Sequence, residues 1–233
     1  MDSGRAMGRQ GNASSEFEAW LRAVDAGDDG ACEAGVSRLQ RDDIRDIVQL
    51  YTGARSDSAQ NQPDGPLAQG GTDIDRANRR WWAVRACADW AGPGERAILL
   101  EMLRDPAVDI RAGAVFCVAQ VVKRHWDGAR DFAEQLLSAL MAALVDEQGL
   151  VRQSAADALA QLGKIALPVL WCAMQQNNQS GRTRAAYALR RMKNLDAAHY
   201  LYRLLEDSNP MVNLYAREGL DDLGLLDMTY YKP

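Results

Sequence analysis

The chain has 233 residues, with 47% hydrophobic and 25% charged residues, enough for one large or two small globular domains. Its net charge of −5 is uneven: residues 1–75 carry seven Lys/Arg against fourteen Asp/Glu (−7), and the rest carries 20 against 18 (+2). Because no region is strongly basic, the charge argues against a nucleic-acid binder.

The four cysteines (Cys32, Cys87, Cys117 and Cys172) lack the CxxC spacing of zinc and redox sites. The N-terminal stretch contains no apolar targeting segment, and no apolar run approaches the roughly 18 residues of a membrane span. We therefore predict reduced cysteines in a cytoplasmic protein, with no metal, no cofactor and no membrane contact.

The N-terminal third is expected to contain a small helical region between two irregular segments. Residues 1–14 are predicted to be flexible, 15–55 to form a helical cap, and 56–75 to be a loop or linker, by composition. The first helix of the cap begins after serine and places apolar side chains at helical spacing: Phe17, Trp20, Leu21 and Val24. Further helices are expected over residues 30–40 and 41–54.

Residues 76–233 repeat a pattern. Five anchor positions follow one another at intervals of 31, 41, 30 and 31 residues: Arg80, Arg111, Arg152, Arg182 and Asn213. Alanine stands three residues after every anchor, at Ala83, Ala114, Ala155, Ala185 and Ala216. Apolar residues stand seven residues after (Cys87, Val118, Leu159, Leu189, Leu220) and ten residues after (Trp90, Val121, Leu162, Met192, Leu223). Because these offsets share one helical face, each unit is predicted to open with an amphipathic helix.

A second helix is predicted in the first four units. Its core positions are expected 19 residues after the anchor (Leu99, Trp171, Leu201) and 23 residues after it (Leu103, Gln175, Leu205). The second unit contains about ten extra residues, after which Leu140 and Leu144 occupy these positions.

Units of about 30 residues with two antiparallel helices resemble HEAT repeats. The segments that carry the resemblance are DPAVDIRAGAV, VRQSAADALAQLG, GRTRAAYALRR and NPMVNLYAREGLDDLG. The resemblance implies an all-α, right-handed superhelical solenoid of about five HEAT-like helix pairs with N-terminal capping helices. It further implies that the second helices line a concave surface.

The arginines at the anchor positions, which we call the arginine row, follow acidic inter-unit turns. We predict that they pair with carboxylates or carbonyls of the preceding turn, a structural role. Asn213 replaces arginine where no further unit follows, as expected for an end cap.

Three places do not reduce to the repeat. Trp81 points nearly opposite the core stripe of its helix and Trp82 about 90° to its side. Both rings therefore need a covering surface, either the N-terminal helices or a partner protein, since tryptophan is common at binding hot spots.

The second place is the insertion in the second unit, around Lys123, Arg124, His125 and Trp126. Insertions in repeat arrays often form binding loops, so these four residues are candidates for partner contact. The alternative is an extended first helix with a solvated end.

The third place is the fourth unit, where cations and aromatic residues are dense. Its candidate residues for a concave patch that binds an anionic partner are Arg184, His199, Tyr200, Tyr202 and Arg203. The alternative is a solvated charged face.

Catalytic signatures such as HExxH, GxSxG and the P-loop are absent from the sequence. We therefore predict a non-enzymatic protein-binding scaffold whose protein partner has an acidic surface. Two alternatives remain, each from a resemblance to other HEAT-like proteins: a phycobilin-lyase-like protein that handles a chromophore, and a DNA glycosylase, which the weakly basic repeats disfavour.

Overall fold

The computed structural model describes residues 13–53 and 72–226, and within these ranges it contains helices and no strand. This confirms the predicted all-α class. The chain divides into two compact units, Met1–Ala86 and Cys87–Pro233, with the boundary inside helix α5 (Asp73–Trp90). The predicted flexible segment 1–14 and linker 56–75 fall mostly outside the described residues, but residues 73–75 are helical, contrary to the linker prediction.

The first unit contains α1 (Ser15–Ala26), α2 (Asp29–Val36), α3 (Ile44–Thr52) and most of α5. The indole Nε1 of Trp20 donates a hydrogen bond to the carbonyl of Cys32 at 3.1 Å, which joins α1 to α2. Gly35 permits this approach, because a Cβ there would lie 2.7 Å from Cδ1 of Trp20. The expected helical cap is thus built around a buried tryptophan.

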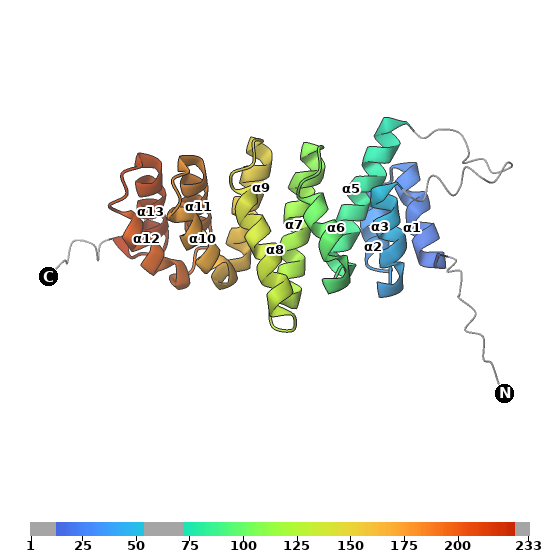
Figure 1. Ribbon diagram of the computed structural model, residues 1–233, viewed down its shortest axis with the longest axis horizontal. Coiled ribbons are helices and arrows are strands. Elements are labelled where there is room, and N and C mark those ends of the chain that lie inside the picture. The colour runs from blue at the N-terminus through green and yellow to red at the C-terminus, as the bar shows by residue number, and fades with distance from the viewer. Residues whose placement is uncertain (1–12, 54–71, 227–233) are drawn as a thin grey trace. The chain divides into compact units, whose positions relative to one another are not determined.

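The second unit is a stack of helix pairs (Figure 1). Its helices are α6 (Arg96–Met102), α7 (Val108–His125), α8 (Arg130–Ala143), α9 (Gly149–Leu162), α10 (Leu167–Met174), α11 (Gln179–Arg191), α12 (Ala198–Leu204) and α13 (Pro210–Asp222). The first helices form one row, in which α7 contacts α9, α9 contacts α11 and α11 contacts α13. Among the second helices, α6 contacts α8 and α8 contacts α10. This arrangement is an α-solenoid, as predicted, because each pair buries its apolar stripe against its neighbours.

The core of the first helices follows the predicted register. All five alanines three residues after an anchor and all five residues seven after it are 0% exposed. The position ten residues after the anchor is less uniform: Val121 and Leu162 are buried, whereas Trp90, Met192 and Leu223 are only half-buried. Trp90 is therefore not the full core residue that the pattern predicted.

The predicted register of the second helices was wrong by one residue. The buried position lies 22 residues after the anchor, at Met102, Met174 and Leu204, and not 23 residues after it. In the third unit Leu170 is buried, while the neighbouring Trp171 is half-buried. Gln175 therefore never was a core position, which removes the irregularity in the predicted pattern.

The insertion of the second unit lengthens both helices instead of forming a protruding loop. Helices α7 and α8 have 18 and 14 residues, whereas α9 has 14 and α10 has 8. Figure 1 shows the turn between α7 and α8 projecting beyond the neighbouring pairs. The expectation of a binding loop is corrected to a long helical hairpin.

One stretch of the described residues, Gly149–Met174, has the length and mean hydropathy (1.2) of a membrane span. It consists of α9, a 3-10 turn over Gly163–Ala166, and α10. Gly163 adopts a positive φ of 57° where α9 ends, a conformation that favours glycine. The buried apolar side chains of this stretch, such as Leu159 and Leu170, form part of the repeat core.

Candidate functional site

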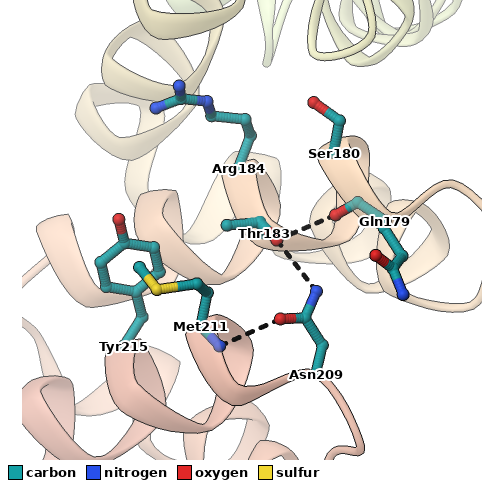
Figure 2. A pocket seen from close by; sticks show the side chains of 7 residues that line it. All are labelled: Gln179, Ser180, Thr183, Arg184, Asn209, Met211 and Tyr215. Atoms are coloured by element: carbon teal, nitrogen blue, oxygen red, sulfur yellow. Dashed lines mark hydrogen bonds between the residues drawn. The ribbon is translucent and has the colours of Figure 1, made fainter.

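An open pocket of about 450 Å³ lies between the first turns of α11 and α13 (Figure 2). We call it the α11–α13 pocket. Seven residues line it: Gln179, Ser180, Thr183, Arg184, Asn209, Met211 and Tyr215. Its walls therefore combine a cation, an aromatic ring, a thioether and several neutral polar groups.

Hydrogen bonds fix one wall of the pocket. The Thr183 hydroxyl donates to the carbonyl of Gln179 at 2.9 Å and accepts from Nδ2 of Asn209 at 3.2 Å. Oδ1 of Asn209 accepts from the backbone N–H of Met211 at 3.0 Å, which caps α13. Asn209 thus links the two helices while starting the second.

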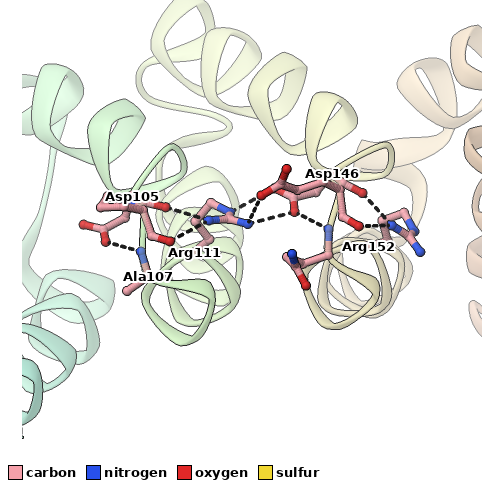
Figure 3. Close-up of polar contacts among 8 residues, drawn as sticks. Asp105, Ala107, Arg111, Asp146 and Arg152 are labelled. Carbon is pink, nitrogen blue, oxygen red and sulfur yellow. Dashed lines mark hydrogen bonds and ion pairs between the residues drawn. The ribbon is translucent and has the colours of Figure 1, made fainter.

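The arginine row lies at the inter-unit turns and is structural, as predicted (Figure 3). Arg111 donates from Nη1 to the carbonyls of Asp105 and Pro106 at 2.7 and 3.2 Å. Its Nε and Nη2 donate to the two carboxylate oxygens of Asp146 at 3.0 and 3.1 Å. Arg111 therefore closes its own turn and also holds the turn of the next unit, a contact that the sequence pattern did not predict.

Electrostatics at this contact favour both charged forms. Burial alone would raise the pKa of the Asp146 carboxyl, but the hydrogen bonds from Arg111 and from the Gln148 N–H, with the charges of Arg111 and Arg152, together lower it. The hydrogen bond to Asp146 raises the pKa of Arg111, against the opposing effect of burial.

The later members of the row repeat only parts of this arrangement. Arg152 donates to the carbonyls of Asp146 and Glu147 at 2.6 and 2.9 Å, but its Nε is buried without a partner. The position that corresponds to Asp146 in the next turn is Gln176, a neutral residue. Arg182 again pairs with an acid of the next turn, Asp207.

Residues 179–193 carry five cations and no acidic residue, yet most of these cations are paired. Their acidic partners are Asp207 for Arg182, Glu218 for Arg190, Asp157 for Arg191 and Asp222 for Lys193. Arg184 differs, because its partner among the described residues is the neutral side-chain oxygen of Gln153, at 2.7 Å. Arg184 is thus the cation of this segment that lacks a counter-charge, and it lines the α11–α13 pocket.

A second group of candidate residues gathers on the second helices α10 and α12. The Tyr200 ring lies 5.6 Å from that of Trp171 and 5.7 Å from that of His199, between centroids. The guanidinium carbon of Arg203 lies 5.3 Å from the centroid of Trp171, a distance at which cation–π attraction operates. We call these four residues the second-helix cluster; Trp171 was missed as a site residue because the predicted register placed it in the core.

The structure therefore divides the site predicted in the fourth unit. Arg184 contacts α9 through Gln153, on the row of first helices, whereas His199, Tyr200 and Arg203 meet Trp171 on α10. The Tyr202 hydroxyl donates to the carbonyl of Leu225 at 3.0 Å, so it fastens the C-terminal turn. The prediction of one patch is corrected to two separate groups.

The candidates in the second unit lie at the end of the α7–α8 hairpin, where Lys123 is exposed. Arg124 donates to the carbonyls of Ala88 and Ala91 at 2.5 and 2.6 Å, so its guanidinium has a structural role. His125 packs against Phe132 at 5.6 Å, and the Arg130 guanidinium lies 3.9 Å from the ring centroid of Trp126. These contacts are local to the hairpin.

The two tryptophans of the first unit have different environments. Trp82 is 3% exposed and Trp81 is 38% exposed, with ring centroids 5.0 Å apart in an edge-to-face arrangement. The α5 residues around Trp82 bind the N-terminal helices: Asn78 to the Val24 carbonyl, Arg79 to Asp25, and Arg85 to Glu33. Since positions 78, 82 and 85 share one helical face, α1 and α2 cover Trp82. The prediction of Trp82 as a partner contact is corrected; Trp81 stays half-open.

Comparisons with known proteins identify the repeat type. The family model of HEAT repeats matches residues 97–190. A search of curated proteins gave no match.

Several solved structures are similar to the chain. YibA of Escherichia coli is 19% identical, with 94% of this chain and 80% of that chain covered and a TM-score of 0.48. An engineered protein is 15% identical, with 91% and 97% covered and a TM-score of 0.42. A designed armadillo repeat protein, solved in complex with the peptide (KR)4, is 15% identical, with 90% and 100% covered and a TM-score of 0.38.

The matched segment runs from α6 to the last turn of α11, and its core positions recur at the repeat interval. Residues 97–190 of this chain are HEAT repeats.

Proposed function

We propose that this protein is a non-enzymatic scaffold that binds a partner protein through the second-helix cluster: Trp171, His199, Tyr200 and Arg203. The observation that carries the proposal is that Trp171, Tyr200 and Arg203 contact one another while none of them is buried. The repeat core does not require these large side chains, because Leu170, Leu201 and Leu204 fill the buried positions beside them.

The residue types fit protein recognition. Tryptophan, tyrosine and arginine are the side chains that most often dominate protein–protein binding energy. Here the ring contacts hold the aromatic side chains in place, so little conformational entropy is lost when a partner binds. Arg203 is exposed and carries a positive charge, which favours a partner with an acidic surface.

The solenoid supports the same proposal. Helices α10 and α12 are held by their own buried residues, and a site on rigid elements keeps its geometry. We further propose a cytoplasmic location, where reducing conditions keep thiols free; the four cysteines are free thiols in the structure.

Quantitative affinity purification from the source cells tests this proposal. The bait is the full chain, compared with the double variant Trp171→Ala/Arg203→Ala and with a control, Arg217→Ala, which removes an exposed arginine of α13. We expect a protein that is retained by the wild type and the control and lost with the double variant. Equal recovery with all three baits, in folded protein of equal thermal stability, would exclude the second-helix cluster as the binding surface.

A further inference from the structure

We propose that the α11–α13 pocket is a second binding site, which receives a glutamate side chain from an acidic segment of a protein. It lies on the row of first helices, so the inference is independent of the function proposed for the second-helix cluster. Nothing in the repeat pattern requires this pocket.

The charge of Arg184 is the first argument. Four of the five cations over residues 179–193 have a carboxylate partner in the structure, and Arg184 has a neutral one. Only one of its nitrogen atoms, Nη1, is engaged with Gln153. A guanidinium has five N–H donors in a planar fork that suits a carboxylate, so Arg184 retains donors for an acidic ligand.

The unpartnered polar groups around it are the second argument. The side chains of Gln179 and Ser180 and the hydroxyl of Tyr215 line the pocket without a hydrogen-bond partner in residues 13–53 and 72–226. Each of them can donate to a carboxylate or to the adjoining peptide carbonyls. No acidic side chain lines the pocket, so nothing there repels an anion.

The shape and apolar content of the pocket favour a peptide side chain over a small inorganic anion. Its volume of about 450 Å³ is in the range of sites for organic ligands, far larger than a single ion needs. Met211 is 42% exposed, and with the Tyr215 ring it offers an apolar wall for the methylene groups of glutamate. The Tyr215 ring is held by Tyr187 at 5.5 Å between centroids.

The test measures binding of two blocked peptides, tetraglutamate and tetraglutamine, to the full chain by isothermal titration calorimetry and by NMR of the arginine side chains. The variants are Arg184→Gln, which removes the charge, and Arg184→Lys, which retains it. Lys164→Gln is the control, because it removes an exposed cation outside the pocket. Thermal unfolding verifies that each variant is folded.

We expect saturable binding of tetraglutamate, with perturbation of the Arg184 side-chain resonance. Affinity should fall about tenfold in Arg184→Gln, as expected for loss of a charged hydrogen bond, fall less in Arg184→Lys, and stay unchanged in Lys164→Gln. Equal binding of tetraglutamine, or equal affinity of wild type and Arg184→Gln, would overturn the proposal. So would binding of inorganic phosphate in the pocket with no binding of tetraglutamate, which would indicate a general anion site.

Discussion

Arg111 and Asp146 form a two-pronged ion pair between consecutive repeats, with N···O distances of 3.0 and 3.1 Å. Their side chains are only 8% and 15% exposed. Because Arg111 also binds the carbonyls of its own turn, one side chain couples the turn geometry of two successive units. Stability of the stack should therefore be sensitive to either partner.

Replacing Asp146 by asparagine should lower the free energy of unfolding of the second unit by about 3 kcal/mol, since it leaves the half-buried charge of Arg111 uncompensated. Urea denaturation followed by circular dichroism measures this loss. Asp127→Asn, at the exposed end of the α7–α8 hairpin, is the control and should be nearly neutral. A similar effect of both variants would contradict the role of the ion pair.

The pH dependence of this loss has a defined direction. The pKa of Asp146 is lowered in the folded protein, so its contribution to stability is complete above the ordinary aspartate pKa of about 4. The contribution is lost as pH falls through the lowered folded pKa. The difference in unfolding free energy between wild type and Asp146→Asn should therefore be constant near neutral pH and shrink below about pH 4. A difference that grows on acidification would be inconsistent with the ion pair.

Gln176 stands where the neighbouring turns have aspartate, and Arg152 lacks the corresponding partner. Replacing Gln176 by aspartate should supply that partner and raise stability by about 1 kcal/mol, or the melting temperature by roughly 2–4 °C for a domain of this size. Differential scanning calorimetry measures the shift. Gln176→Asn, which provides the same shape without the charge, should give no increase, and equal melting temperatures for the two variants would refute the expectation.

Trp81 and Trp82 are adjacent but should respond differently to truncation. Trp82→Ala should destabilise the first unit by about 3–5 kcal/mol, because it removes a large buried ring. Trp81→Ala should cost about 1 kcal/mol, mainly the edge-to-face contact with Trp82. Chemical denaturation monitored by fluorescence of the remaining tryptophans distinguishes them. Comparable losses would mean that both rings are equally buried in solution.

The four cysteines should differ in reactivity. Burial raises the pKa of the Cys32 thiol to about 11, and the carboxylates of Asp29, Asp28 and Asp25 add to this effect, so little of the reactive thiolate forms near neutral pH. Cys87 and Cys117 are buried as well, whereas Cys172 is exposed. A thiol reagent should therefore label one cysteine rapidly in the native protein and all four in denaturant. Mass spectrometry that finds rapid native labelling at Cys32 would contradict this order.

The core of the first helices could be predicted from the sequence in detail. The alanines and apolar residues at fixed distances from the anchors are all fully buried, because the helical period alone decides which side chains share a face. The second helices were less predictable: they have only seven or eight residues in the units of normal length, too few for periodicity to distinguish neighbouring registers. Trp171 was misplaced for that reason.

What the sequence determined by itself is therefore the class of fold, the repeat interval and most of the core. Only the tertiary structure decided which polar groups meet, since the ion pair of Arg111 with Asp146 joins residues 35 positions apart. It likewise separated Arg184 from His199, Tyr200 and Arg203, and placed Trp82 beneath α1 and α2. A local pattern specifies the direction of a side chain on its own helix, but its partner depends on how helices from different units pack together.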